Sequence, residues 1–233
     1  MNMKQTKFKE NDLPYSEFQK LGLSKADILS LDKNSLEALL SGKRTNLLNI
    51  KAIDSKGELL EFKGKLSISR NPDNSVGVNI HPVRQEIKND IGLKPDELEK
   101  LKKSQLVAKV INGEKCLVQL DKQTNEILIA KVKNITIPSH IKDVELSSTQ
   151  KNNLKQGLPI TIDSGKETLQ VGLDLNSPRG LKLTDESFDQ KQKVDFDDAN
   201  PQIIGTVQTD KNISEFVDYQ KKHENKNNNP LKM

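Results

Sequence analysis

The stretch from Leu146 to Leu183, LSSTQKNNLKQGLPITIDSGKETLQVGLDLNSPRGLKL, repeats the pattern of an earlier stretch from Leu93 to Ile129. When the two are aligned on Leu154 and Leu101, an apolar residue follows six positions later in each. A looser third copy begins near Leu36. Self-similarity of this kind is typical of chains built from repeated supersecondary units. The matching hexapeptides are Cys116-Leu-Val-Gln-Leu-Asp121 and Leu169-Gln-Val-Gly-Leu-Asp174.

Each copy has the pattern of one short helix followed by three strands. Pro95 suits the first position of a helix, and Gly157 suits the left-handed residue that ends one. Asn112-Gly113 is the strongest hairpin signal in the chain. The sequence therefore predicts an α+β protein with a small N-terminal helical head, about three helix-plus-β-meander repeat units and a disordered C-terminal tail. The predicted boundaries are 1–32 for the helical segment, 33–92, 93–143 and 144–185 for the first, second and third αβββ units, and 186–233 for a polar linker and tail with a candidate strand and helix at 203–222.

Several local signals support these elements. Ser24 followed by Asp27 resembles a capping box, which predicts a helix start there. Gly64 interrupts an alternating apolar run and is a candidate β-bulge. Asp121 and Asp174 open matching turns. Each is expected to accept the backbone N–H two residues later, as in an Asx turn, rather than to bind a metal.

A single unit of this size is marginal by itself. A lone three-stranded sheet beneath one short helix buries too little apolar surface to offset its ordering entropy. We therefore expect the αβββ units to pack against one another.

The composition favours small cores and a bacterial-type cytoplasmic protein. Only 33% of the residues are hydrophobic and 3% are aromatic, with no Trp. The single cysteine rules out an intramolecular disulfide. The sequence has no run of about 18 apolar residues, so no membrane span is predicted. The polar start of the chain lacks the apolar segment of a signal peptide.

Charge is distributed unevenly along the chain. The net charge is +4, but residues 185–233 carry 7 Lys+Arg against 10 Asp+Glu. The rest of the chain carries 30 against 23, a net charge of +7. That surplus supports weak phosphate contact, although an ordinary solvated surface explains the interspersed charges better.

No pattern of residues indicates catalysis. Phosphate loops, dinucleotide fingerprints, zinc spacings and HExxH are missing from the sequence. Cys116 alternates with apolar residues, which predicts a small core residue rather than a reactive thiol. A hydrolase or nuclease would need His81 to meet acidic residues in one cleft. We therefore expect a protein that is not an enzyme and holds no metal or cofactor.

Two sets of residues are candidates for binding. The first is basic and would face a nucleic-acid phosphate, although the strands lack the aromatic residues that stack on bases. The second is a group of apolar residues within the polar tail, which we call the apolar island and expect to dock on a protein partner. The alternative is that this segment folds back on the rest of the chain. The first set is Lys43, Arg44, His81, Arg84, Lys102 and Lys103, and the second is Ile203, Ile204, Val207, Ile213, Phe216, Val217 and Tyr219.

Four motifs carry a resemblance to known proteins: LEALLSGKRT at 36–45, NIHPVR at 79–84, VQLDKQTN at 118–125 and VGLDLNSP at 171–178. With them, the chain resembles a pair of adjoining domain-of-unknown-function families of Bacteroidota. The head at 12–24 resembles the first family, and about 31–184 resembles the second. The resemblance implies a gene on a conjugative or integrative element, often near a DNA topoisomerase, and implies no particular activity or functional residue.

The leading hypothesis from the sequence is a non-enzymatic binding or adaptor protein of a bacterial mobile element, with a protein partner and no membrane contact. The alternative is a nucleic-acid-binding accessory factor in mobile-element DNA metabolism, associated with a topoisomerase.

Overall fold

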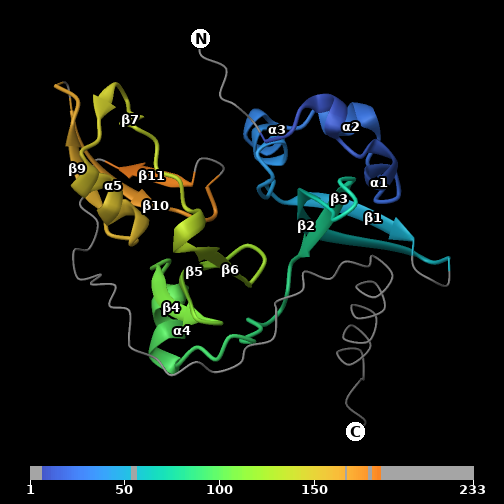
Figure 1. Ribbon diagram of the computed structural model, residues 1–233. Helices are drawn as coiled ribbons and strands as arrows, with labels where there is room; N and C mark the ends of the chain where they lie inside the picture. The colour runs from blue at the N-terminus through green and yellow to red at the C-terminus, as the bar shows by residue number, and fades with distance from the viewer. Residues whose placement is uncertain (1–6, 54–56, 166, 178–179, 185–233) are drawn as a thin grey trace, which may run out of the picture. The chain divides into compact units, whose positions relative to one another are not determined.

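The structure of the protein is a computed structural model that describes residues 7–53, 57–165, 167–177 and 180–184. These residues belong to two compact units, which meet in sequence between Val83 and Arg84 (Figure 1). The predicted linker, tail, strand and helix beyond Thr184 lie outside the described residues. Among the helices that are described, none has the length and apolar content needed to cross a bilayer.

The first compact unit begins with four short helices. Side-chain hydrogen bonds cap the start of two of them. The Oγ atom of Ser24 accepts the N–H of Asp27 at 3.2 Å, and the Asp27 carboxylate accepts the N–H of Ser24 at 2.8 Å, which confirms the capping box. Asp32 caps the next helix, and hydrogen bonds from Ser35 and Asn46 hold the pKa of its carboxyl below the ordinary value. The helices are η1 (Glu10–Asp12), α1 (Tyr15–Gln19), α2 (Lys25–Leu29) and α3 (Lys33–Leu40).

An antiparallel sheet follows, with strand order β1-β2-β3. Its apolar side chains form one core with those of α1, α2 and α3, which lie on one side of the sheet (Figure 1). The predicted bulge at Gly64 is wrong, because Gly64 pairs in regular antiparallel register with Leu48 on one side and with Pro82 on the other, at the end of each ladder. A Cβ at Gly64 would lie 3.1 Å from the carbonyl oxygen of His81, so close backbone approach explains the glycine. The strands are β1 (Leu48–Ile53), β2 (Leu59–Arg70) and β3 (Val76–Pro82).

The second unit contains two helix-and-sheet layers in succession. The first has strand order β4-β5-β6 and the second β11-β10-β9, so the middle strand along the chain is central in both. The Asn112-Gly113 turn has positive φ at both residues (52° and 76°), as a type I′ hairpin requires. The elements are α4 (Pro95–Lys102), β4 (Val107–Ile111), β5 (Glu114–Asp121), β6 (Glu126–Lys131), η2 (Val132–Asn134), β7 (His140–Ile141), β8 (Val144–Glu145), α5 (Ser148–Lys155), β9 (Ile160–Asp163), β10 (Thr168–Leu173) and β11 (Leu181–Thr184).

The residues aligned in the sequence occupy equivalent places in these two layers. Leu101 on α4 and Leu154 on α5 are each fully buried, in the separate cores of their own sheets. Val118 and Val171 are likewise buried on the two central strands. The helical head, followed by small antiparallel sheets, confirms the predicted α+β class.

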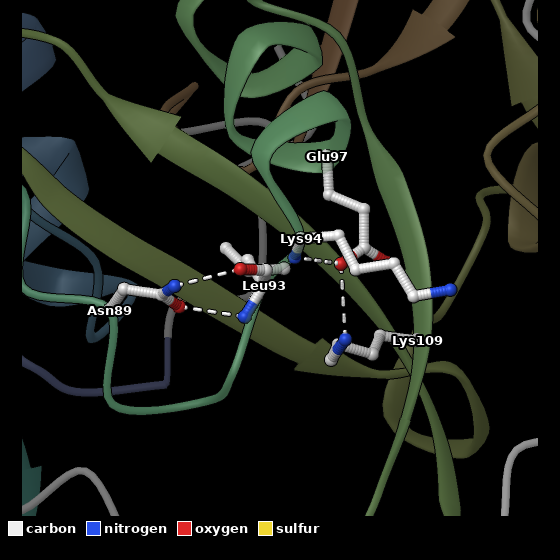
Figure 2. Close-up of polar contacts among 5 residues, drawn as sticks. All are labelled: Asn89, Leu93, Lys94, Glu97 and Lys109. Atoms are coloured by element: carbon white, nitrogen blue, oxygen red, sulfur yellow. Dashed lines mark hydrogen bonds and ion pairs between the residues drawn. The ribbon is translucent and has the colours of Figure 1, made fainter.

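A cluster of polar contacts anchors α4 (Figure 2). The Oε2 atom of Glu97 accepts the backbone N–H of Lys94 at 2.6 Å and the ammonium group of Lys109 on β4 at 3.1 Å. The side chains of Glu97 and Lys109 are only 15% and 17% exposed. Just upstream, the side-chain amide of Asn89 binds both the N–H and the carbonyl of Leu93. One carboxylate therefore caps the helix and attaches it to the sheet.

Replacing Glu97 with alanine is expected to lower the free energy of unfolding by about 1–3 kcal/mol, because a helix cap and a mostly buried ion pair are removed together. Urea unfolding followed by circular dichroism measures this change. Glu99→Ala is the matched control on the same helix, since the Glu99–Lys102 pair is mostly exposed and should contribute little. Equal losses of stability in the two variants would contradict the anchoring role of Glu97.

Candidate functional site

The middle sheet, β4-β5-β6, is buried on both faces. Alternate residues of β5 belong to the core under α4. The intervening residues point to the opposite face, which we call the second face of the middle sheet. They are buried as well: Leu117 is 0%, Gln119 6% and Asp121 2% exposed. This face must therefore have its own covering layer.

The turn between β10 and β11 supplies part of that layer. The backbone N–H of Leu175 donates to Oε1 of Gln119 at 2.6 Å. The next residue, Asn176, donates from its side-chain amide to the carbonyl oxygen of Leu120 at 3.2 Å. Two hydrogen bonds from one turn thus hold the last sheet against the middle one.

The end of α5 supplies a second contact. Gly157 follows this helix with φ of +80°, and a Cβ there would lie 3.3 Å from both methyl carbons of Leu117. A glycine therefore satisfies two demands at this position, the left-handed backbone that ends the helix and the close approach to Leu117. Gly157, which predicts the end of α5 from the sequence, therefore also marks the contact with Leu117.

Both predicted Asx turns are present. Oδ1 of Asp121 accepts the N–H of Gln123 at 3.1 Å, and Oδ1 of Asp174 accepts the N–H of Asn176 at 2.9 Å. The Asx turn at Asp174 shapes the loop between β10 and β11, which contacts Gln119. Among the described residues, no three His, Cys, Asp or Glu side chains are grouped so as to hold a metal ion.

The turn between β5 and β6 holds the start of the second unit. Its Thr124 carbonyl accepts the N–H of Arg84 at 3.0 Å, and the Asn125 side-chain amide donates to the Arg84 carbonyl at 2.7 Å. Asp121 and Glu126, at the two ends of this turn, are opposite each other in register, and both are buried. The β5–β6 turn therefore binds the middle sheet to Arg84, at the start of the second compact unit. Gln119 binds the same sheet to the loop between β10 and β11.

A charged cluster lies at the other end of β5. Glu114 binds Lys131 at 2.6 Å and also pairs with Lys133, and these hydrogen bonds lower the pKa of its carboxyl. Burial, followed by the nearby Glu114 charge, raises the pKa of the Cys116 thiol. A raised pKa disfavours the nucleophilic thiolate, in line with the sequence interpretation of Cys116 as a core residue.

The predicted basic residues divide between the two units. Lys43 and Arg44 are adjacent and half-buried after α3, whereas Lys102 and Lys103 are adjacent and exposed at the end of α4. Arg84 is half-buried. His81 is only 3% exposed and lies 2.9 Å from Oγ of Ser67 through its Nε2 atom. The assignment of these residues to a phosphate-facing surface stays a prediction, and the seven predicted partner-docking residues lie outside the described residues.

The first sheet carries both exposed apolar side chains and lysines on the side turned away from α1–α3. We call this side its outer face. Five large hydrophobic side chains are exposed among the described residues, and Ile53 (63%), Leu59 (61%) and Val83 (40%) are on this face. Ile53 and Leu59 are partners in register at the tip of the β1–β2 hairpin. Val83 extends the β3 ladder by donating its N–H to the carbonyl of Lys63 at 3.1 Å. The outer face thus offers apolar contacts beside lysines.

Sequence reasoning missed both of these surfaces. Gln119 belongs to an alternating strand and reads as a solvent-facing position. Ile53 and Leu59 flank a turn, and their pairing on the outer face depends on a register that composition does not reveal. The fixed period of two in a strand was the available signal, because it separates Ile53 from Ile50 and Ala52 on opposite faces.

Comparison with known families gives one match. Residues 8–92 match a family described as Protein of unknown function (DUF4099), which covers the helical head and the first sheet. The comparisons with curated proteins and with solved structures gave no match.

Replacing Gln119 with leucine, which keeps the volume but removes the acceptor, should lower the free energy of unfolding by about 1–3 kcal/mol because the Leu175 N–H loses its partner. Hydrogen exchange should also become faster in β9 to β11, which would be held less firmly. Gln123→Leu is the control, since this side chain is exposed. Unchanged exchange in the Gln119 variant would show that the bond to Leu175 does not hold the last sheet in place.

Proposed function

We propose that this protein is a non-enzymatic binding or adaptor protein of a bacterial mobile element, acting in the cytoplasm without a cofactor. The match to DUF4099 is compatible with this proposal but specifies no activity. The association with a mobile element rests on the resemblance to Bacteroidota families carried by the four motifs at 36–45, 79–84, 118–125 and 171–178.

The observation that carries the binding role is the series of small sheets whose edge strands pair with no strand of another sheet within the described residues. The edge of β1 is partly used already, because the N–H of Lys51 donates to the carbonyl of Leu21. Edge strands carry backbone N–H and carbonyl groups that an extended partner segment can use. Interlocking through Gln119 and Gly157 keeps the second and third sheets in a fixed arrangement. Such an array offers partner surfaces along its length.

The apolar island at 203–219 is the segment that we propose docks on a protein partner. The helix expected after Asn212 would carry Ile213, Phe216 and Val217 on one face and Glu215 and Asp218 on the other. An amphipathic helix of this kind fits a hydrophobic groove with a basic rim.

Changing Phe216 and Val217 to aspartate in the full chain should abolish capture of the partner from cells of the native host, because two apolar anchors become charged. Quantitative mass spectrometry of affinity-purified protein measures this loss. Asn227→Asp with Asn228→Asp is the matched control, since it adds the same charge to the tail and leaves the apolar residues intact. Recovery of the same proteins with both double variants, or of none with the unaltered chain, would overturn the partner-docking role.

The alternative function is nucleic-acid binding by an accessory factor of mobile-element DNA metabolism, associated with a topoisomerase. The specific observation in its favour is that Lys102 and Lys103 are exposed side by side at the end of α4. The surplus of positive charge in residues 1–184, with 30 Lys+Arg against 23 Asp+Glu, would add to their attraction for phosphate.

Under this alternative, duplex DNA should be retarded in a gel at about 50 mM salt, with affinity falling steeply by about 200 mM. Lys102→Glu with Lys103→Glu should reduce the slope of log affinity against log salt by about 1 for each phosphate that is no longer neutralised. Lys151→Glu with Lys155→Glu is the control, because it reverses two lysines on α5, the helix aligned with α4. Absence of retardation at about 50 mM salt, where phosphate contacts are strongest, would exclude the alternative.

A further inference from the structure

The tip of the β4–β5 hairpin is formed by Asn112 and Gly113, the only Asn-Gly pair in the sequence. Both residues are exposed. The register pairs Ile111 with Glu114, so the N–H of Gly113 lies outside the ladder, and it donates to no described residue. A Cβ at Gly113 would have no atom within 4 Å apart from its chain neighbours. The tip therefore places a side-chain amide next to a backbone nitrogen that is open to reaction.

We propose that Asn112 is a site of spontaneous deamidation, which converts the hairpin tip to an isoaspartyl residue. The backbone nitrogen of Gly113 attacks Cγ of Asn112 and forms a C–N bond, while the bond from Cγ to the amide nitrogen breaks. The proton given up by Gly113 is balanced by the one that the departing nitrogen takes to become ammonia. Water then opens the cyclic succinimide at either carbonyl carbon, which gives aspartate or isoaspartate. The reaction needs only water.

The other described asparagines with positive φ lack this combination of groups. After Asn74, the next backbone nitrogen is occupied, because Ser75 donates it to Oδ1 of Asp73 at 3.0 Å. At Asn125, the side-chain amide is itself held, because it donates to the carbonyl of Arg84 at 2.7 Å. Both of these turns restrain a group that must move for the ring to close. The structure therefore selects the hairpin tip among these three turns.

The two products have different effects on the hairpin. Aspartate leaves the main chain unchanged, and Asp-Gly is itself a favoured pair for a type I′ turn. Isoaspartate carries the main chain through the side-chain methylene and so lengthens the turn. Because loop length selects the turn type, the pairing of Ile111 with Glu114 should be disturbed only by isoaspartate.

The disturbance would reach the core beneath α4. Strand β4 contributes Val107 and Ile111 to that core, and its Lys109 binds Glu97 on α4 at 3.1 Å. A hairpin held less firmly at its tip should therefore weaken the contact between the middle sheet and its helix. Isoaspartate formation makes the stability of this layer depend on the age of the molecule.

Peptide mapping of the full-length protein tests the reaction. The folded protein is incubated in mildly alkaline buffer, which favours loss of the Gly113 proton, and is then digested with trypsin. Residues 110–115 form one tryptic peptide with a single asparagine. We expect this peptide to gain the mass difference between an amide and an acid, in two forms that separate by chromatography. The isoaspartyl form should accept a methyl group from an isoaspartyl-specific carboxyl methyltransferase.

Two results of this experiment would overturn the proposal. One is a 110–115 peptide that stays unmodified in the folded protein, and a parallel incubation in urea would show whether the hairpin protects it. The other is modification that proceeds no faster than in the peptides that contain Asn74 and Asn125.

Two variants test the consequence for stability. Asn112→Gly removes the amide and keeps a turn that accepts positive φ at both positions. During incubation, the urea midpoint of the unaltered protein should fall and hydrogen exchange in β4 and β5 should become faster, whereas Asn112→Gly should not change. Asn112→Asp carries the charge without the altered main chain, so its midpoint should match that of the fresh unaltered protein. An equal fall in Asn112→Gly, or a midpoint of fresh Asn112→Asp as low as that of the aged protein, would overturn the role of isoaspartate.

Discussion

The contact between the last sheet and the second face of the middle sheet is the constraint on which the rest of the second unit depends. Leu117 and Gln119 have no place in the core under α4 and yet are almost fully buried. Their cover is made by Gly157 after α5 and by the turn that follows β10. Without that layer, Leu117 would be exposed to water and Gln119 would lose the N–H group whose hydrogen bond it accepts. The middle sheet is therefore not a complete folding unit by itself.

The polar groups at this contact determine the arrangement of the sheets more than apolar burial does. A hydrophobic contact tolerates sliding, because it is non-directional. The bonds from Leu175 to Gln119 and from Asn176 to Leu120 require one position of the turn. The Asx turn at Asp174 holds that loop in the conformation that presents both donors. Local turn chemistry thus fixes the relation between two sheets.

Much of this architecture could be predicted from the sequence because it depends on local signals. The Ser24 capping box, the Asn112-Gly113 hairpin and both Asx turns are decided by residues within a few positions of one another. The bulge predicted at Gly64 is wrong, since a strand pattern cannot distinguish a missing ladder bond from close backbone approach. The β7–β8 pairing was not foreseen, because two-residue strands carry no period. The cover over Gln119 joins residues 56 positions apart, which no local pattern encodes.

The differences between the repeats follow from where each sheet stands in the series. Aligning Leu101 with Leu154 places Leu117 on Gln170 and Gln119 on Gly172. In the last sheet, Gln170 donates to the hydroxyl of Thr161, so its second face is built from polar groups that satisfy one another. Terminal repeats need a polar outer side, whereas inner repeats need a surface that a neighbour can cover. Leucine in the middle sheet and glutamine in the last one therefore each match the surroundings of their own sheet.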